Sequence, residues 1–505
     1  MSSGIPIAWV QLGAILAVLF AAPFRLDVDP DFWWHLRTGD LIVHHGIPRH
    51  DVFSWSAQGQ AWTVHEWLSE AIIYVVQTTL GYAANAALFG AAAVGALVLM
   101  YQLARRGGAG SRLLVGLMLV AVAIFAIFIA VRPQVFTWLL FAVFLFVLQR
   151  DYDGDSVPLW PLVPLMGLWA NMHLGFVYGL VLIGAWCLAR VFDHARGRPA
   201  DLRKALLIVA ACVLAACLNP HGPTILSYPV RYFIEGQADR SLVREWQRPD
   251  VRVIAQQPIF LADILLLGAL CLRTRPRPFL CIVTIAFITL SLQALRNAPF
   301  VGLLLLPVAG SAFAARWPMA SRAKDSGTRV GVLLVIAVIA IVLGSVVLVA
   351  VQRGAGVSLR DPSERGYPAA GAAWVNAHGP GKRILNEYSW GGYLIEVLNP
   401  RAQVFIDGRA DFYGNRILND YATMYRARAG WRELLTRYDP DVVFIPKTAP
   451  LAEALRNDSL WHEEFSSDIE SVFVKQRLTR FSGTTTLPRT RTDGFRPGSR
   501  RRAPA

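Results

Sequence analysis

Long apolar segments recur along this 505-residue chain, and they restrict the folds open to it. Most are 15 to 22 residues long, close to the roughly 20 residues that a helix needs to cross a bilayer. Hydrophobic residues make up 54% of the chain and charged residues only 17%, a composition too apolar for an ordinary soluble protein. The sequence therefore predicts a polytopic α-helical membrane protein.

We expect about 11 transmembrane helices. They are predicted at residues 5–24, 83–104, 113–131, 135–149, 157–172, 175–189, 205–218, 258–272, 279–295, 300–315 and 330–351. The first segment lacks the basic region of a secretory signal, so we expect it to be retained as a span. Residues 67–80 are apolar but short and carry Glu70, which predicts a helix that lies at the membrane surface or re-enters the membrane.

The distribution of Lys and Arg predicts the orientation of the chain. Alternate loops at 105–112, 150–156, 190–204, 273–278 and 316–329 carry 16 Lys and Arg. The short turns on the other side carry only Arg132 and Arg296. Because basic loops tend to stay in the cytoplasm, the first set of loops is predicted to be cytoplasmic.

Two classes of protein are disfavoured by the composition. A net charge of +14 would suit a nucleic-acid-binding protein, but the arginines sit in membrane loops and in a C-terminal tail, so topology explains most of them without nucleic acid. All five cysteines lie in apolar segments. Neither an external disulfide framework nor a metal finger is therefore expected.

A polar stretch of residues 25–70 follows the first span. It combines carboxylates and histidines with five tryptophans, a mixture typical of the membrane–water interface. Asp29, Pro30 and Gly46 suit a helix cap, a first helical position and a helix stop. We therefore expect a first extracytoplasmic loop at 25–82 with two helices along the membrane surface.

The predicted orientation gathers scattered polar residues at one membrane face. The 25–70 stretch, Arg132, residues 171–173, the loop 219–257 and residues 296–297 all fall on the extracytoplasmic side. Polar groups that converge on one face from distant parts of a membrane protein indicate a single site.

The composition changes after residue 351, where the transmembrane module of 1–351 is predicted to end. Residues 352–477 have the character of an extracytoplasmic α/β domain, with strands expected at 441–447 and 471–476 and a helix at 431–438. Residues 390–393 indicate a turn into a strand, and 404–414 a strand that leads into an Asp-Gly turn. Residues 478–505 are basic and rich in Thr, Pro and Gly, which is typical of a disordered tail.

The chain resembles the membrane glycosyltransferases of the GT-C class. An early span, an acidic loop with two surface helices, further spans and an outer domain are similar in layout. The opening D-P-D-x-W-W-H at 29–35 is similar to the bacterial Rgt-like branch; the class also includes dolichyl-phosphate-mannose-protein mannosyltransferases and aminoarabinose transferases of lipid A. Gly46 follows Asp31 by about four turns, as in the first juxtamembrane helix of these proteins, and 59–66 resembles the start of the second. At the positions of Asp31 and Phe32, other branches carry two adjacent acidic residues. At the positions of His65 and Glu66, they carry Pro-Pro.

This resemblance implies an enzyme of the bacterial inner membrane. It would take a sugar from a polyprenyl-phosphate carrier and transfer it to an extracytoplasmic glycolipid, polysaccharide or protein. Such a transfer requires a base at the acceptor hydroxyl and cations at the departing phosphate. Asp31 is the first candidate for the base and Asp29 the second. Alternatively, both residues have only a structural role. Asp29 would then cap the helix, and the charge of Asp31 would interact favourably with the helix dipole.

The remaining candidates are assigned to substrate binding: His35, His65, Glu66, Arg132, His173, His221 and Arg296. Arg132 and Arg296 occupy tight turns. Two roles are left open for each of them: contact with a phosphate, or snorkelling of the charged group to the membrane surface. Capping or interface packing is the favoured role for His173 and His221. His65 and Glu66 with Asp31 form only a weak signal for a divalent cation, so metal dependence stays open. The polar run at 407–414 leaves open a contact with the acceptor.

Two other functions remain as alternatives. A transporter or lipid flippase tends to carry charges near the bilayer midplane and to show repeated halves, whereas these spans are nearly free of ionisable residues and no repeat is visible. A non-catalytic scaffold of an envelope assembly complex is the third alternative.

Overall fold

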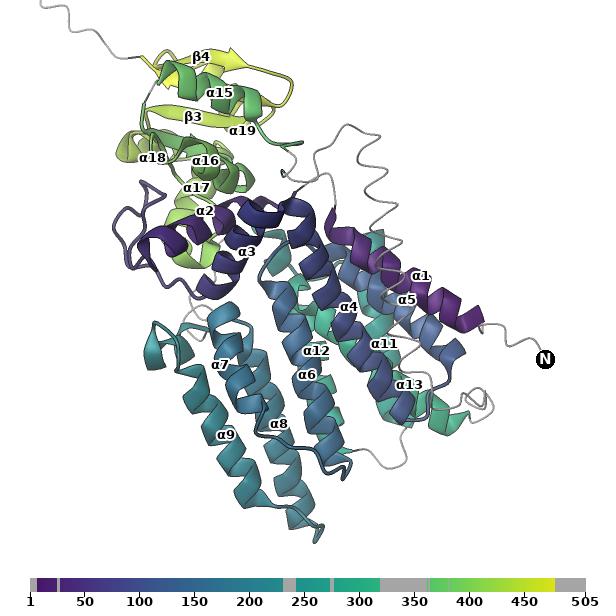
Figure 1. Ribbon diagram of the computed structural model, residues 1–505. Helices are drawn as coiled ribbons and strands as arrows, with labels where there is room; N and C mark the ends of the chain where they lie inside the picture. Colours follow the sequence, from purple (N-terminus) through teal and green to yellow (C-terminus); the bar gives the residue numbers. More distant parts are fainter. Residues whose placement is uncertain are drawn as a thin grey trace, which may run out of the picture.

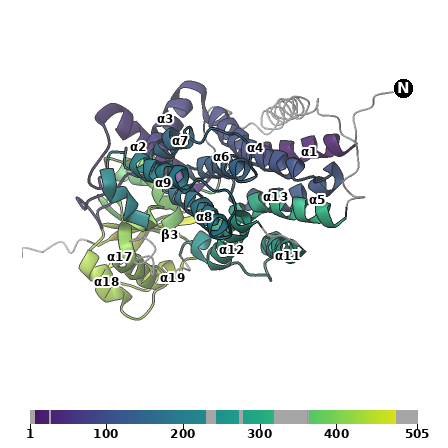
Figure 2. The same ribbon diagram turned by 90° about the horizontal axis from the view of Figure 1, so that it is seen from below.

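The computed structural model describes residues 7–24, 28–229, 242–272, 277–317, 361, 364–379 and 381–476. Apolar helices form a bundle within this part of the chain (Figure 1). They are α1 (Ile7–Ala21), α4 (Tyr82–Arg106), α5 (Ser111–Phe128), α6 (Gln134–Tyr152), α7 (Leu162–Met172), α8 (Phe176–Ala195), α9 (Leu202–Ala216), α11 (Gln257–Leu272), α12 (Pro278–Gln293) and α13 (Ala298–Arg316). One side of the bundle is formed by α7, α8 and α9 and the other by α1, α5 and α13, as the view in Figure 2 also shows.

These helices occupy the positions of all the expected spans except 330–351, so the prediction of a polytopic helical chain is confirmed. Seven of the described helices are long and apolar enough to cross a membrane, and α7 and α12 are apolar but shorter. The number of spans therefore remains a prediction. The expected span at 330–351 and the tail at 478–505 lie outside the described residues.

Two further helices lie between the bundle and the C-terminal domain (Figure 1). The first, α2 (Pro30–His45), begins as predicted, because the Asp29 side chain accepts a hydrogen bond of 3.0 Å from the backbone N–H of Asp31. It ends at Gly46, whose φ of 86° favours glycine. The second, α3 (Trp67–Leu80), matches the expected helix and packs along α2.

The C-terminal domain contains a five-stranded mixed sheet in the order β2-β1-β3-β5-β4. Its strands are β1 (Arg383–Asn386), β2 (Gln403–Val404), β3 (Val442–Pro446), β4 (Trp461–Ser466) and β5 (Glu470–Lys475). β1 runs parallel to β2 and β3, whereas β5 is antiparallel to β3 and β4. The helices of the domain are α15 (Ala369–His378), α16 (Gly391–Leu398), α17 (Ala410–Tyr425), α18 (Trp431–Tyr438) and α19 (Pro450–Arg456). The α/β domain is confirmed, with β3, β5 and α18 at the expected positions.

Two predictions within this domain are wrong. Residues 390–393 do not lead into a strand, because Gly391 begins α16. The glycines there allow close packing instead: a Cβ at Gly392 would lie 2.7 Å from the backbone oxygen of Pro30. The segment 404–414 is not a strand either, since β2 ends at Val404 and α17 begins at Ala410.

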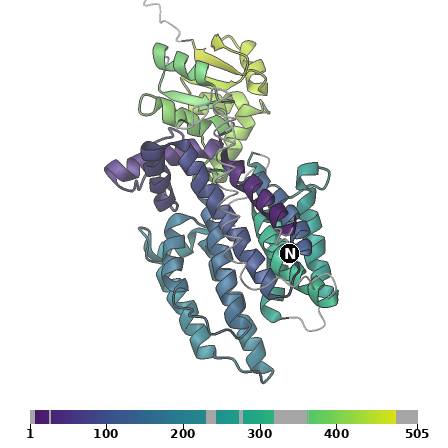
Figure 3. The same cartoon turned by 45° about the vertical axis from the view of Figure 1, so that its right-hand side comes forward.

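The C-terminal domain packs directly on α2, as Figure 3 shows from a second side. The ring of Trp33 contacts those of Tyr367 and Tyr393 at centroid distances of 5.4 and 5.2 Å. Trp55 Nε1 donates a hydrogen bond of 3.1 Å to the backbone oxygen of Ile384 on β1. This packing brings the loop between β2 and α17 to the first turn of α2.

Candidate active site

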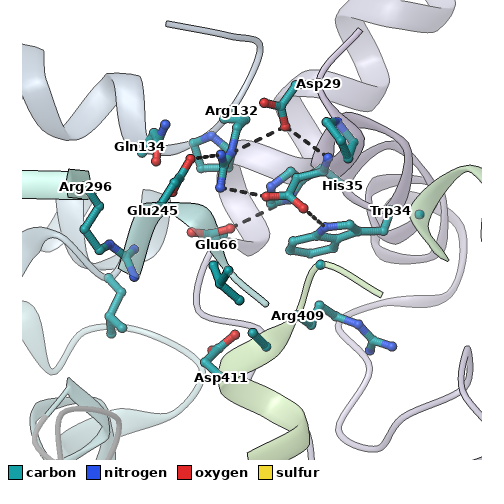
Figure 4. A pocket seen from close by; sticks show the side chains of 18 of the residues that line it. Asp29, Trp34, His35, Glu66, Arg132, Gln134, Glu245, Arg296, Arg409 and Asp411 are labelled. Atoms are coloured by element: carbon teal, nitrogen blue, oxygen red, sulfur yellow. Dashed lines mark hydrogen bonds and ion pairs between the residues drawn. The ribbon is translucent and has the colours of Figure 1, made fainter. Parts of the chain in front are cut away.

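A cavity of about 560 Å³ lies where the helical bundle, α2, α3 and the C-terminal domain meet (Figure 4). Its wall contains the first turn of α2, residues 62–66 before α3, the turn before α6, residues 242–246 and the start of α17. The sequence candidates that line it are Asp29, Asp31, His35, His65, Glu66, Arg132, His173 and Arg296. The chain thus brings eight of its nine candidates to one place.

His221 is the candidate that does not line this cavity. Its Nε2 donates a hydrogen bond of 3.2 Å to the backbone oxygen of Val64. This contact holds the segment before α3 in place, which agrees with the packing role favoured from the sequence.

Arg132 connects three carboxylates at the start of α2 (Figure 4). Its guanidinium lies 2.6 Å from Asp31 Oδ2, 3.6 Å from Asp29 Oδ1 and 2.5 Å from Glu245 Oε1. Trp34 Nε1 donates to the other oxygen of Asp31 at 3.1 Å. The Asp31 carboxylate is therefore held in a fixed orientation at the cavity wall.

The environment of Asp31 favours its protonated form more than water does. Burial, opposed by Arg132 and reinforced by the neighbouring Asp29 and Glu245, raises the pKa of Asp31 to about 7. A carboxylate with such a pKa can accept a proton effectively near neutral pH. Arg132 remains a cation throughout, because its three carboxylate partners raise its pKa well above the usual value despite burial.

Glu66 stands among three histidines on the other side of the cavity. Its carboxylate lies 3.2 Å from His173 Nε2 and 3.7 Å from both His35 Nδ1 and His65 Nδ1. Burial raises the pKa of Glu66 and lowers those of His35 and His173. His35 and His173 are therefore held as neutral imidazoles.

The contacts of His173 settle which of its nitrogens carries the proton. Nδ1 receives hydrogen bonds from the Thr137 hydroxyl at 2.8 Å and from the backbone N–H of Gly175 at 2.9 Å. The Thr137 oxygen itself accepts from Trp169 Nε1 at 2.8 Å. Because Nδ1 accepts, Nε2 holds the proton and donates it toward Glu66.

Asp411 joins the cavity from the first turn of α17. Its Oδ2 accepts from His65 Nε2 at 3.1 Å and from the Tyr228 hydroxyl at 2.7 Å. Burial acts to raise the pKa of Asp411, but these hydrogen bonds lower it to about 2. Burial likewise acts to lower the pKa of His65, yet Asp411 and Glu66 raise it above the usual value. The two side chains form an ion pair in the cavity wall.

The other charged residues of the 407–414 run face inward. Arg409 is 2% exposed and forms ion pairs with Asp407 at 2.6 Å and Asp51 at 2.7 Å. Its guanidinium also stacks 4.4 Å from the ring of Trp62. This buried pair fastens the C-terminal domain to the first loop. It leaves Asp411 as the carboxylate of the run that lines the cavity.

Three side chains of this region fit a divalent cation. Among the described residues, the ligand atoms of His35, Glu66 and Glu70 all lie within 4.8 Å of one another. Glu70 Oε2 is buried and has no hydrogen-bond partner in the described part of the chain, and burial raises the pKa of this side chain. One neutral imidazole and two carboxylates are suitable donors for such ions. This set shares only Glu66 with the predicted one. Glu70 replaces Asp31, which is engaged by Arg132, and His35 replaces His65, which is paired with Asp411.

Sequence reasoning did not select Glu70 or Glu245 as site residues, and for Asp411 it left open only a contact of the 407–414 run with the acceptor. Glu70 appeared only as a polar residue in a short apolar segment, and Glu245 lies in an arginine-rich loop. Asp411 belongs to the most polar run of the C-terminal domain, which was a usable signal. The contact of that run with α2 depends on tertiary packing.

The chain matches no family model and no curated protein sequence. Its fold is similar to that of the archaeal oligosaccharyltransferase AglB from Archaeoglobus fulgidus, solved in complex with an inhibitory peptide and a dolichol-phosphate. The TM-score is 0.54 and the identity 14%, over 87% of this chain and 69% of that chain. A further similar structure is ArnT from Cupriavidus metallidurans bound to undecaprenyl phosphate, with a TM-score of 0.46 and 16% identity over 93% of this chain and 98% of that chain.

The fold and the apolar helices define the class of this chain. It is a multi-pass membrane protein with a GT-C-like fold and a C-terminal α/β domain. The resemblance stated from the D-P-D-x-W-W-H opening and the layout is thus confirmed at the level of the fold.

Proposed function

We propose that this protein is a membrane glycosyltransferase that moves a sugar from a polyprenyl-phosphate donor to an extracytoplasmic hydroxyl. The observation that carries the proposal is the place of Asp31, oriented by Trp34 and Arg132 in the wall of a cavity that also contains Arg296. The bacterial inner membrane, with the C-terminal domain outside, is the proposed location.

An apolar groove beside the catalytic cavity supports a lipid-linked donor. A second cavity, of about 440 Å³, lies between the first turns of α8 and the last turn of α12. It is lined by Val177, Tyr178, Val181 and Leu290, and it shares Arg296 with the catalytic cavity. We place the isoprene units next to the phosphate in this groove, with the phosphate beside Arg296 and the sugar toward Asp31.

The proposed reaction assigns a task to each charged group. Asp31 accepts the proton of the acceptor hydroxyl as its oxygen attacks the anomeric carbon, and the bond from that carbon to the phosphate oxygen breaks. Arg132 and Arg296 stabilise the negative charge that grows on the phosphate. When a phosphate competes for Arg132, Asp31 loses part of its counter-charge and becomes a stronger base. A single displacement of this kind inverts the configuration of the sugar.

A divalent cation held by His35, Glu66 and Glu70 would add positive charge to the same cavity. The histidines and Asp411 order the wall opposite Asp31. Tyr388 and Ser389 of the C-terminal domain also line the cavity, on the side where we place the acceptor.

A transporter or flippase receives less support. Among the described apolar helices, the carboxylate that lies away from a helix end is Asp263, and Ser291 donates to it at 3.3 Å. The other charged side chains of the described residues gather in the cavity at one end of the bundle or at the opposite helix ends, rather than along a path between them.

The test is transfer by the purified full-length protein from a radiolabelled polyprenyl-phosphate sugar to a membrane extract of acceptors. We expect labelled product with the lipid-linked donor and none with the nucleotide sugar. Arg296→Ala and Arg132→Ala should impair transfer, whereas Arg203→Ala, an exposed arginine on α9 outside the cavity, should not. Activity with the nucleotide sugar and none with the lipid form would refute the donor assignment.

A further inference from the structure

A third cavity, of about 370 Å³, lies at the end of the bundle away from the C-terminal domain. The last turns of α4, α6, α11 and α13 and the start of α12 enclose it, near the bottom of Figure 1. Arg106, Arg277 and Arg316 stand in its wall, and Asp153 is the one carboxylate among the described residues that line it. The predicted orientation places this end at the cytoplasmic surface.

Positive charge exceeds negative charge around this cavity. Arg277 pairs with Asp153, and Arg106 pairs with Asp155, which Arg150 also approaches at 2.9 Å. Within the described part of the chain, no carboxylate pairs with Arg316, whose guanidinium lies 5.7 Å from the ring of Trp317. Among the described residues here, four arginines therefore share two aspartates, and the cavity favours an anion.

A buried acceptor at the same place has no donor. Gln149 lines the cavity, is 3% exposed, and donates through Nε2 to Asp153 Oδ1 at 2.7 Å. Its Oε1 atom is buried and has no hydrogen-bond partner among the residues that the structure describes. A buried amide oxygen in this state is costly unless a ligand supplies a hydroxyl or an N–H. The ligand that suits the cavity therefore combines negative charge with a donor.

Apart from Ser311, whose hydroxyl donates to the backbone oxygen of Pro307, the rest of the described lining is apolar. Leu103, Leu272, Leu280, Pro307 and Ala312 stand beside the arginines. An apolar wall next to cations at the end of membrane helices matches a molecule with a hydrocarbon part and a charged head.

We propose that this cavity binds an anionic glycerophospholipid whose headgroup carries a hydroxyl, of the phosphatidylglycerol type. The phosphodiester oxygens accept hydrogen bonds from Arg277 and Arg316. The headgroup hydroxyl donates to Gln149 Oε1. The acyl chains leave along Leu103 and Leu280 into the inner leaflet. This site is separate from the catalytic cavity and does not depend on the proposed transfer reaction.

The experiment uses the full-length protein, freed of lipid in a neutral detergent. It is titrated with phosphatidylglycerol, phosphatidylcholine of the same acyl chains, or glycerol 3-phosphate, and binding is read by native mass spectrometry and by Tm. Of the three compounds, we expect only phosphatidylglycerol to stay bound to the protein and to raise its Tm. Arg277→Gln and Arg316→Gln should each weaken this binding roughly five-fold. Arg203→Gln removes the same charge at the same end outside the cavity and should bind as the wild type does.

Gln149→Leu tests the headgroup contact. The wild type should prefer phosphatidylglycerol to phosphatidylmethanol, which has the same charge but no hydroxyl, and the variant should lose this preference. Retention of the preference in the variant contradicts the contact. Equal binding of phosphatidylcholine, or wild-type binding by the double variant of Arg277 and Arg316, overturns the lipid site. Binding of glycerol 3-phosphate as tight as that of the lipid shows a soluble phosphate ester as the ligand and also overturns it. The Tm of each variant in lipid-free detergent separates lost binding from lost folding.

Discussion

Gly408 of the C-terminal domain lies directly against Asp31 at the start of α2. A Cβ at position 408 would overlap the Asp31 carboxylate and would stand 2.8 Å from Trp34 Nε1. Glycine is needed here for this close approach of a backbone to a side chain, rather than for an unusual φ. The C-terminal domain thus fixes the position of the candidate base.

We expect Gly408→Ala to displace Asp31 and to reduce transfer about 10²-fold, since a shift of roughly 1 Å at a reacting group has effects of this size. The matched control is Gly184→Ala on α8, where an added Cβ meets nothing within 4 Å. Initial rates and Tm should be measured together. Wild-type rates in the Gly408 variant would mean that Asp31 does not need this position.

Asp31→Asn tests the base itself. The amide can still accept from Trp34 but cannot take a proton, so we expect transfer to fall by roughly 10²–10⁴-fold with folding intact. Asp29→Asn should be milder, because asparagine also caps helices. Asp40→Asn, which breaks a 2.8 Å pair with Arg37 on the same helix, is the control. Near-normal transfer by the Asp31 variant would reduce Asp31 to a helix-start residue.

The pH dependence of transfer follows from the raised pKa of Asp31. A base acts only when deprotonated, so kcat/KM should fall as the pH drops through about 7. Arg132 lowers the pKa of Asp31 against the effect of burial. Arg132→Gln should therefore move the acidic limb of the profile to higher pH, in addition to lowering its maximum. A limb that stays in place in this variant would argue against Asp31 as the titrating group.

The His65–Asp411 pair should stabilise the fold within a limited pH window. Because folding raises the pKa of His65, this side chain adds to the free energy of unfolding. The contribution is fully present below the unfolded pKa of about 6.5 and is lost as the pH rises through the folded pKa. Because folding lowers the pKa of Asp411, this carboxylate also adds to the free energy of unfolding. Its contribution is present above the unfolded pKa of about 3.9 and is lost as the pH falls toward the folded pKa of about 2. Asp411→Asn should therefore lower Tm most near about pH 5.5 and less near about pH 9. The exposed Asp468→Asn should show no such dependence; a constant difference for Asp411→Asn would exclude the charged pair.

The cation prediction concerns His35, Glu66 and Glu70. A chelator should lower Tm and Mn²⁺ should restore it, since a ligand at 100 times its Kd stabilises the folded state by about 2.7 kcal/mol. Glu70→Gln should abolish the Mn²⁺-dependent shift, whereas Glu396→Gln on α16, outside this group, should keep it. The absence of any shift with Mn²⁺, Mg²⁺ or Zn²⁺ in the wild type would contradict a cation site.

Local signals in the sequence were sufficient for the helices around the site. Asp29 and Gly46 mark the ends of α2 because capping depends on neighbouring residues alone. Charge bias and hydrophobicity likewise placed Arg132 and Arg296 in turns at one end of the bundle. These properties are readable from one segment at a time.

The contribution of the C-terminal domain was not readable in this way. The pair at Gly391 and Gly392 has the local pattern of a turn, but it begins α16. Glycine is required there because a side chain would strike neighbouring backbone, a contact that the local sequence does not show. The local sequence likewise does not show that Gly408 packs against Asp31. Asp411 reaches the cavity because contacts such as the Arg409–Asp51 pair hold the start of α17 against the first loop. Such contacts join segments that are distant in the chain, and the periodicity of the sequence does not predict them.

The orientation of the chain remains a prediction on which the donor assignment rests. Glu433 on α18 and Arg203 on α9 are both exposed, so their labelling reports the side of the membrane rather than burial. In a variant without native cysteines, we expect a membrane-impermeant maleimide to label Glu433→Cys from outside and Arg203→Cys only after permeabilisation, because basic loops remain cytoplasmic. The native Cys271 is exposed and must be replaced for the test to be clean. The reverse pattern would turn the Asp31 cavity toward the cytoplasm, where nucleotide sugars are available, and the lipid-linked donor would lose its rationale.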